Sequence, residues 1–279
     1  MSPTRFSTPR ASASARCRSP WRSCSDPACR RPGQHPIGRD QNHAQEAEMK
    51  IGIIGAGKIG GTLTRRLTAL GHKVSVANSR GPKSLAGLAA ETGAKAVSVE
   101  EAARSGELVV VTIPEKNVPQ LPRNLFDGVA REVVVVDTGN YYPRQRDGRI
   151  DGIEDGLTES RWVEKQLGRP VIKAFNNIYA EHLLKLGKPS SAKGRIALPV
   201  AGDDAAAKEV VLRLVEELGF DAVDAGGLDE SWRQQPGTPV YTADFDAAGV
   251  RRALSEATEE RGPDWRATAR SPGSFDRPN

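Results

Sequence analysis

The chain has 279 residues, of which 38% are apolar and 27% charged, a composition that suits one large or two small soluble globular units. No apolar run approaches the roughly 20 residues that a membrane-spanning helix needs, so we expect no membrane association. The net charge is +5, but residues 1–48 hold 8 Arg and no Lys against 4 acidic residues, so +4 of it lies there. The remainder is nearly neutral, which argues against a nucleic-acid partner.

Residues 1–48 are rich in Ser, Pro and Arg and show neither helical nor strand periodicity, so we predict a disordered basic extension. All three cysteines (Cys17, Cys24, Cys29) lie in it at spacings unlike paired zinc ligands, and we predict no metal site. A transit peptide is an alternative, but Met49 directly precedes the first predicted strand and we favour translation starting there. The rest of the chain then has no cysteine, which suits a reducing compartment, and we expect a cytoplasmic protein.

From Met49 onward, predicted strands and helices alternate. The run "KIGIIGAGKIGGTLTRRLTALGHKVSVANS" predicts a strand, a glycine turn, a helix and a second strand, and residues 204–218 predict a later helix. Further predicted strands are "KAVSV", "LVVVTI", "EVVVVD", "PVIKAF", "RIALPVAG" and "DAVDAG". Apolar strands joined by helices imply a parallel sheet covered on both faces. We therefore predict an α/β fold with a doubly wound (Rossmann), mostly parallel sheet and a smaller α/β C-terminal part.

The first motif is the G-x-G-x-x-G segment at residues 55–60, which follows a strand and opens a helix. Gly55 would allow the tight turn, Gly57 would let the backbone approach a pyrophosphate, and Gly60 would let the helix pack closely on the strand. The helix amino terminus would then face the anion with unpaired N–H groups. The predicted dinucleotide-binding residues of this segment are Gly55, Ala56, Gly57, Lys58, Ile59 and Gly60.

The second motif, "ANSRGPKS", follows the second strand, where an NAD-binding protein would carry an acidic residue. Asn78, Ser79 and Arg80 stand there instead, and a guanidinium can hold a 2′-phosphate with two charge-assisted hydrogen bonds. One such bond is worth about 1.5 to 3 kcal/mol, or roughly ten- to a hundred-fold preference for NADP(H) over NAD(H). Lys83 adds charge nearby. The alternative is that Arg80 is an ordinary solvated loop arginine.

These residues resemble a known family. Residues from Met49 to about Tyr241 are similar to the NADP-dependent oxidoreductases of the coenzyme F420 type, which are relatives of the oxidoreductase domain of the STEAP metalloreductases. The resemblance is carried by "IGIIGAGKIGGTL", "NSR", "VVVTIPEKNV", "PVIKAFNNIYAEHL" and "VAGDDAAAKEVVLRLVEELGFDAVDAGGL".

The resemblance implies an enzyme that passes a hydride between NADP(H) and a planar acceptor such as coenzyme F420 or a flavin. It implies that Ser79 and Arg80 hold the 2′-phosphate. It also implies that Thr112, Ile113 and Pro114 lie beside the nicotinamide, and that the loop before Asn176 borders the second ring. The implied organisation is an NADP-binding Rossmann domain over residues 49–160, a C-terminal part over 161–262 that completes the substrate site, and a loose tail over 263–279.

Hydride transfer depends mainly on the positions of the two rings, so no acid–base dyad is required and the catalytic residues stay unknown. Thr112, Pro114 and Asn176 are the positioning candidates. Of the other polar side chains, His72 is expected to be structural and His182 to lie at the surface. Residues with a possible contact to substrate are Lys173, Tyr141 and Tyr142.

The segment "ADFDAAGVRRALSEATEERG" departs from the family, because a sheltering apolar segment is expected there. Arg233 and the "QPGTPVY" turn could instead shape an open pocket for a different small-molecule substrate. Two alternatives therefore stay open. One is an imine or 2-hydroxy-acid reductase of the pyrroline-carboxylate reductase kind, although the strands that resume at "PVIKAF" count against its all-helical domain. The other is a non-catalytic NADP-binding sensor or partner subunit. A homodimer is compatible with each of these.

Overall fold

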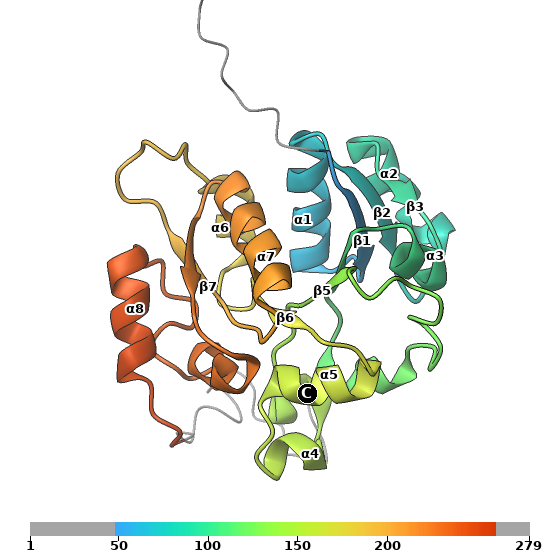
Figure 1. The fold of residues 1–279 in the computed structure, drawn as a ribbon. Coiled ribbons are helices and arrows are strands. Elements are labelled where there is room, and N and C mark those ends of the chain that lie inside the picture. The colour runs from blue at the N-terminus through green and yellow to red at the C-terminus, as the bar shows by residue number, and fades with distance from the viewer. Residues whose placement is uncertain (1–47, 261–279) are drawn as a thin grey trace, which may run out of the picture. The chain divides into compact units, whose positions relative to one another are not determined.

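The computed structural model describes residues 48–260. Its main sheet has six parallel strands in the order β3-β2-β1-β4-β5-β6, and β7 and β8 form a separate parallel pair. The strands are β1 (Lys50–Ile54), β2 (Lys73–Ala77), β3 (Lys95–Ala96), β4 (Leu108–Val111), β5 (Val134–Asp137), β6 (Ile172–Lys173), β7 (Ala197–Val200) and β8 (Asp221–Asp224). This strand order confirms the predicted doubly wound, mostly parallel fold (Figure 1).

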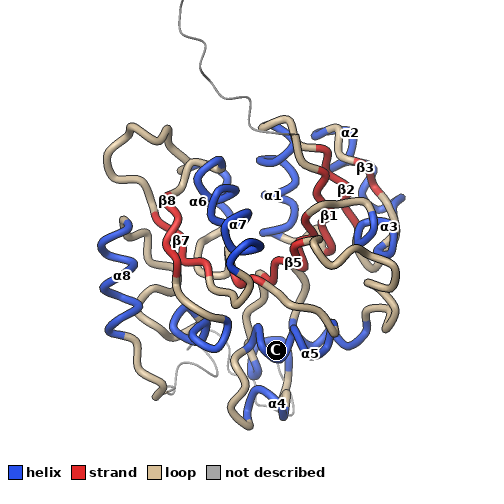
Figure 2. Tube along the Cα trace, viewed as in Figure 1, coloured by secondary structure: helices blue, strands red, loops and turns tan. Residues whose placement is uncertain are grey.

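Helices connect and cover the strands, as the coloured tube in Figure 2 shows. The α-helices are α1 (Lys58–Ala69), α2 (Ala86–Thr92), α3 (Val99–Arg104), α4 (Asp151–Glu154), α5 (Glu159–Leu167), α6 (Ala180–Lys185), α7 (Ala205–Glu217) and α8 (Ala247–Glu256). The shorter turns are the 3₁₀ segments η1 (Pro82–Leu85), η2 (Glu115–Gln120) and η4 (Leu228–Gln234), and the π-helical turn η3 (Pro143–Asp147). Helix α6 packs on α1, and α7 and α8 both pack on the β7–β8 pair.

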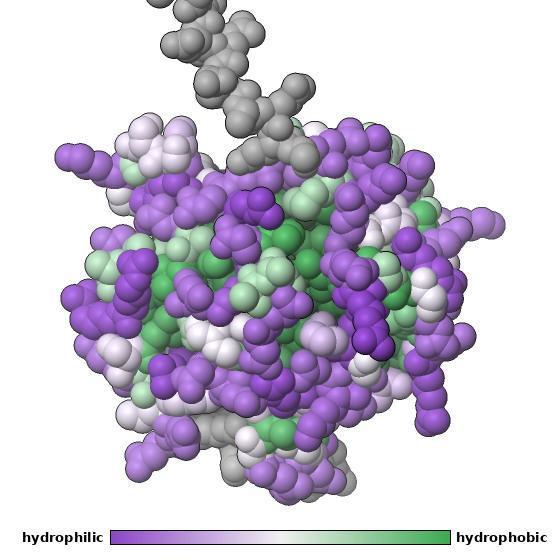
Figure 3. Space-filling view, viewed as in Figure 1, coloured by the Kyte–Doolittle hydropathy of each residue, from purple (hydrophilic) through white to green (hydrophobic). Residues whose placement is uncertain are grey.

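Burial explains why these segments become strands and helices. Every residue of β4 and β5 is buried, as expected of central strands covered on both faces. The predicted helix at 204–218 is α7, whose N-cap Asp204 accepts hydrogen bonds from the backbone N–H groups of Ala206 and Ala207. On the face drawn in Figure 3, hydrophilic residues cover most of the surface and apolar residues show mainly toward the middle.

Two predicted strands are shorter than their apolar runs indicate. In "KAVSV", only Lys95 and Ala96 pair with β2, because Ser98 caps α3 with its side chain in a capping box with Glu101. In "PVIKAF", only Ile172 and Lys173 pair with β5, and Lys173 then forms a single antiparallel bridge to Ala201. The main sheet thus continues past residue 160 to β6. The predicted domain boundary at residue 160 stays a prediction. The predicted extension at 1–48 and tail at 263–279 lie outside the described residues, Glu48 apart.

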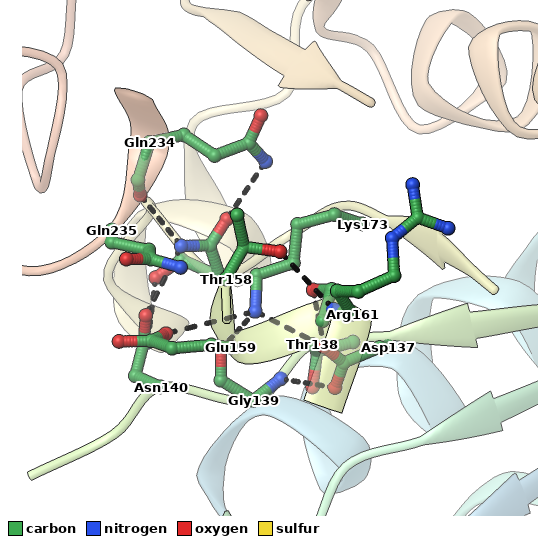
Figure 4. Close-up of polar contacts among 12 residues, drawn as sticks. Asp137, Thr138, Gly139, Asn140, Thr158, Glu159, Arg161, Lys173, Gln234 and Gln235 are labelled. Carbon is green, nitrogen blue, oxygen red and sulfur yellow. Dashed lines mark hydrogen bonds and ion pairs between the residues drawn. The ribbon is translucent and has the colours of Figure 1, made fainter. Parts of the chain in front are cut away.

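A charged cluster lies inside the protein where β5 and β6 end (Figure 4). The Lys173 ammonium is fully buried and donates to Asp137 Oδ2 at 3.1 Å and to the Gly139 carbonyl at 2.6 Å, and it lies 3.9 Å from Glu159 Oε2. Asp137 also accepts a hydrogen bond from Ser160 Oγ at 2.6 Å. Because α5 supplies Glu159 and Ser160, the cluster ties the ends of two strands to a covering helix.

Glu115, at the start of η2, adds a third buried carboxyl group beside Asp137 and Glu159. Its side chain is fully buried, and neither of its oxygens has a hydrogen-bond partner within residues 48–260. Burial, reinforced by the neighbouring Asp137, raises the pKa of Glu115 well above its usual range, although Lys173 opposes the shift. Burial lowers the pKa of Lys173, but the surrounding carboxylates outweigh it and hold that pKa above its usual value. These surroundings therefore favour the neutral form of Glu115 and the charged form of Lys173.

The raised pKa of Glu115 predicts a pH-dependent cost to stability. Above the unfolded-state pKa of about 4.3, unfolding releases the Glu115 proton, so this group destabilises the fold increasingly until the pH passes its folded pKa. Glu115→Gln removes that proton linkage. As the pH rises from 5 to 7, we expect the unfolding free energy of the variant to increase relative to that of the parent by up to about 1.4 kcal/mol per pH unit. Urea melts across this range measure it.

Glu209→Gln is the matched control, because Glu209 is an exposed carboxylate on α7. This substitution should leave the pH dependence of stability unchanged. A constant difference between Glu115→Gln and the parent at every pH would show that Glu115 is ionised in the folded protein.

Candidate functional site

The glycine turn lies between β1 and α1, and Gly55 and Gly60 are required by packing. Gly55 has φ +114°, and a Cβ there would lie 2.2 Å from the Thr112 carbonyl oxygen. A Cβ on Gly60 would lie 1.9 Å from the Gly55 carbonyl oxygen. Any side chain at either position would therefore force the first helix away from the sheet.

Gly57 differs, because a Cβ there would meet no atom within 4 Å. Gly57 is the N-cap of α1, and the first backbone hydrogen bond of the helix runs from the Gly61 N–H to the Gly57 carbonyl at 2.8 Å. The N–H groups of the first turn thus have no partner inside the helix, and no acidic side chain stands in that turn. This combination of open space, unpaired donors and the positive end of the helix dipole suits an anion.

The loop after β2 is held by Asn78. The Asn78 Oδ1 accepts hydrogen bonds from the Arg80 N–H at 2.9 Å and from Ser84 Oγ at 3.0 Å. Ser79 and Arg80 are exposed, and the Arg80 guanidinium makes no hydrogen bond or ion pair within the described residues. Lys83, also exposed, lies in the η1 turn that follows. The loop therefore presents two cationic side chains to solvent while its backbone is fixed from within.

The third predicted segment, residues 112–114, lies directly against the glycine turn. The Thr112 N–H donates to the Ile54 carbonyl at 2.8 Å, and the Gly55 N–H donates to the Ala77 carbonyl at 2.9 Å. These bonds bring the ends of β1, β2 and β4 together. Ile113 is partly buried against the core, and Pro114 precedes the η2 turn that carries the buried Glu115.

Asn176 lies further along the carboxyl edge of the sheet and forms a network of amide side chains with Asn140 and Gln234, which are both labelled in Figure 4. Its Nδ2 donates to Asn140 Oδ1 at 3.0 Å and to the Gln234 carbonyl at 2.7 Å, and its Oδ1 accepts from Gln234 Nε2 at 3.0 Å. Asn176 is buried, whereas Asn140 is partly exposed. Asn140 is thus the member of this network that can meet a ligand, with Asn176 holding it in place.

Sequence reasoning missed Asn140 and Gln234. Asn140 could have been found, because it follows the buried strand "VVVVD" at the edge where ligands bind in such sheets. Gln234 could not, because only the tertiary fold brings η4 against the turn after β6.

Strained backbone flanks the buried pair Asn176 and Asn177. Phe175 (φ 61°) and Thr242 (φ 55°) are the non-glycine residues with positive φ in the described chain, and the Thr242 N–H donates to the Asn177 carbonyl at 2.9 Å. Neighbouring Tyr241 forms a hydrogen bond with the Tyr142 hydroxyl, and burial raises the pKa of both phenols. Such strain concentrates at functional sites in general.

Four other candidate side chains are held by contacts with other groups of the protein. His72 is buried, with its Nδ1 accepting from the Met49 N–H at 3.2 Å and its Nε2 3.0 Å from Glu217. Tyr141 is fully buried, and its hydroxyl accepts from the Ile150 N–H at 3.0 Å. His182 is partly exposed and pairs with Asp244 at 2.7 Å. Lys173 was predicted as a possible contact to substrate. That prediction is wrong, because its ammonium group is fully buried among carboxylates.

Residues 48–260 contain no group of three or more His, Cys, Asp or Glu side chains arranged to hold a metal ion. Within the same range, no helix is both long and apolar enough to cross a membrane.

Comparison with known proteins places this geometry in a family. The model of the family described as NADP oxidoreductase, coenzyme F420-dependent, matches residues 50–141, which contain the glycine turn, the Arg80 loop and Asn140. The Escherichia coli K12 protein YjhV is 47% identical over 94 residues, which are 34% of this chain and 61% of that protein's length. The chain thus spans less than two thirds of this curated relative.

Solved structures extend the likeness beyond residue 141. The hypothetical protein SMa0349 of Sinorhizobium meliloti is 30% identical with a TM-score of 0.61, over 72% of this chain and 97% of that one. A proposed F420-dependent NADP reductase of Arthrobacter sp. FB24 shares the fold, with 24% identity and a TM-score of 0.52, over 64% of this chain and 86% of its own. The family match and the near-complete coverage of a 30% identical structure show that the chain belongs to the NADP oxidoreductases of the coenzyme F420-dependent family.

Proposed function

We propose that this protein is an NADPH-dependent oxidoreductase that transfers a hydride between NADP(H) and a planar acceptor such as coenzyme F420 or a flavin. The observation that carries the proposal is the pairing of an open glycine turn with an unpaired arginine. Gly57 leaves space at the start of α1, and Arg80, without a partner in the described chain, follows the neighbouring strand β2. Family membership supports the NADP(H) part of the proposal.

The residues present fit the phosphates of NADP(H). The pyrophosphate would meet the N–H groups of the first turn of α1, where a Cβ at position 57 would intrude on otherwise open space. The extra 2′-phosphate would meet Ser79 and the Arg80 guanidinium, and no carboxylate stands at the end of β2 to repel it. Lys83 adds positive charge to the same loop.

The carboxyl edge beyond Thr112 would position the two rings. When bound, NADPH supplies the hydride, so the protein needs to hold donor and acceptor close and aligned rather than supply a nucleophile. Thr112 and Pro114 would border the nicotinamide, and Asn140, held by Asn176, would offer an amide donor and acceptor to a ring edge. An uncharged amide edge suits the neutral carbonyl and N–H groups of a deazaflavin or flavin.

Arg80→Ala should separate the two nicotinamide cofactors. Because the guanidinium is proposed to meet only the 2′-phosphate, we expect NADPH to bind at least tenfold more weakly and NADH to bind almost unchanged. Calorimetric titration of each cofactor measures the two affinities. Arg104→Ala is the control, since Arg104 ends α3 just before β4 begins and so lies at the opposite edge of the sheet. Equal losses for NADPH and NADH would refute the assignment of Arg80.

Gly57→Ala and Gly60→Ala should change different properties: Gly57→Ala should weaken NADPH binding, and Gly60→Ala should lower stability. At position 57 the added methyl meets no protein atom, so we expect an unchanged melting temperature and at least tenfold weaker binding of NADPH. At position 60 the methyl clashes with the Gly55 carbonyl, so we expect a loss of about 2 kcal/mol or more in stability. Thermal unfolding with and without NADPH distinguishes the two effects. Full NADPH affinity in Gly57→Ala would place the pyrophosphate elsewhere.

A panel of acceptors tests the reaction itself. NADPH oxidation is followed by absorbance with coenzyme F420, free flavins, ferric chelates and cyclic imines in parallel. We expect turnover with F420 or a flavin, because the proposed acceptor edge is lined by neutral amides. Turnover with imines alone would favour the imine reductase alternative. Tight NADPH binding without turnover of any acceptor would favour a sensor or partner subunit.

A further inference from the structure

Three tyrosines from separate segments come together beyond the carboxyl ends of β5 and β6. Tyr142 follows β5, and its hydroxyl shares a hydrogen bond with that of Tyr241, 99 residues later in the sequence. Tyr179 follows β6 and is the N-cap of α6. Burial raises the pKa of Tyr241, and the nearby phenols of Tyr142 and Tyr179 add to that shift. The three hydroxyl groups therefore belong to one cluster, which the packed chain assembles.

Contacts on two sides fix the position of Tyr179. The carbonyl of the next residue, Ala180, accepts a hydrogen bond at 3.4 Å from Thr62 Oγ1, which lies within the first two turns of α1. On its other side, the Tyr179 ring meets the His182 ring edge-on, with 5.3 Å between their centres. His182 in turn pairs at 2.7 Å with Asp244, three residues after the second tyrosine of the hydroxyl pair. Tyr179 thus lies between the start of α1 and that pair.

Tyr179 is open to solvent at the edge where ligands bind in such sheets. Its exposed fraction is 53%, the highest of the large hydrophobic side chains in the described part of the chain. An aromatic ring left open at this place is suited to stacking on a flat ring of a ligand. Tyr142 differs, because the Arg146 guanidinium lies over its ring at 5.0 Å. Tyr142 therefore has its hydroxyl group to offer, rather than the face of its ring.

The hydroxyl pair can donate one hydrogen bond to a ligand. Two phenols carry two hydroxyl protons, and the bond between Tyr142 and Tyr241 uses one of them. Burial raises the pKa of both phenols, so both protons stay in place at neutral pH. Both side chains are partly exposed, so the second proton can reach a ligand. A carbonyl oxygen is the natural partner for such a donor.

We propose that Tyr179, Tyr142 and Tyr241 bind the hydride acceptor: Tyr179 stacks on its flat ring system, and the hydroxyl pair donates to one of its carbonyl oxygens. The inference rests on the proposed function and narrows it. A molecule that meets both requirements is a conjugated ring system with carbonyl groups, which describes a deazaflavin or a flavin. A simple cyclic imine has neither an extended flat ring system nor a carbonyl group.

Tyr179→Leu and Tyr179→Phe test the stacking contact through steady-state kinetics of the full chain at saturating NADPH. We expect Tyr179→Leu to raise the KM for coenzyme F420 or a flavin about fivefold or more, because an aliphatic side chain cannot stack as a ring does. The kcat and the NADPH affinity should change little. Tyr179→Phe keeps the ring and should behave like the parent.

Leu186→Ser is the matched control, because Leu186 is an exposed apolar residue at the other end of α6. This substitution should leave the KM for the acceptor unchanged. An unchanged KM in Tyr179→Leu, or an equal loss of NADPH affinity in that variant, overturns the proposal.

Riboflavin and acridine test the hydroxyl pair, because both contain three fused flat rings and only riboflavin carries carbonyl groups. Calorimetric titration of the full chain in the presence of NADP⁺ measures both affinities. Tyr142→Phe combined with Tyr241→Phe should weaken riboflavin binding about threefold or more and leave acridine binding unchanged. Tyr179→Leu should weaken the binding of both. A parallel loss of riboflavin and acridine in the double variant refutes the hydrogen bond, and an unchanged NADPH affinity shows that the fold persists.

The binding measurements separate this inference from the reaction itself. Riboflavin binding that depends on Tyr179, without turnover of any acceptor, would refute hydride transfer and support the tyrosines as a ring-binding site. Turnover of coenzyme F420 or a flavin with an unchanged KM in Tyr179→Leu would support the reaction and overturn the tyrosine site. A parent protein that binds neither riboflavin nor coenzyme F420 also overturns it.

Discussion

The buried ammonium group of Lys173 is the contact on which the carboxyl edge of this sheet depends. It joins Asp137 of β5 to the Gly139 carbonyl and lies among carboxylates that would otherwise repel one another. Removing one partner of such a buried group generally costs 3–5 kcal/mol, because it leaves an uncompensated charge. The backbone of the same residue bridges to Ala201, so Lys173 also links the main sheet to the segment that follows β7. The turn that carries Asn140 is therefore held by two sets of contacts. One is the pairing of Lys173 with Asp137 and the Gly139 carbonyl, and the other is the set of hydrogen bonds among the amide side chains.

Different kinds of contact fix the backbone at the two ends of the proposed cofactor site. The glycine turn is set by close backbone packing, in which Gly55 and Gly60 leave no room for side chains. The loop after β2 is fixed by the side chain of Asn78, which accepts a hydrogen bond from the backbone N–H of Arg80, while the exposed Arg80 guanidinium has no hydrogen bond or ion pair within the described chain. A fixed loop with an unpaired charge loses little conformational freedom when it meets an anion. This arrangement can favour a phosphate without any movement of the sheet.

The sequence predicts much of this fold because its signals are local. The glycine turn, the apolar strands β4 and β5, and the capped helix α7 each follow from neighbouring residues. The partners of Lys173 do not, because Asp137, Glu159 and Glu115 come from separate segments that only the packed chain brings together. An isolated lysine after an apolar strand looks the same whether it faces a ligand or a buried carboxylate. The amide network is hidden for the same reason, since Gln234 lies 58 residues after Asn176.

The two lateral borders of the main sheet are both short. On one side β3 pairs through two residues only, and on the other β6 has two residues before a single antiparallel bridge to Ala201 ends the ladder. A long flat border of unpaired N–H and C=O groups is a template for another chain, and natural sheets avoid it by such truncation. Copies of this protein thus have little opportunity to join strand to strand at the borders of the main sheet, whose parallel strands come from distant segments of the sequence.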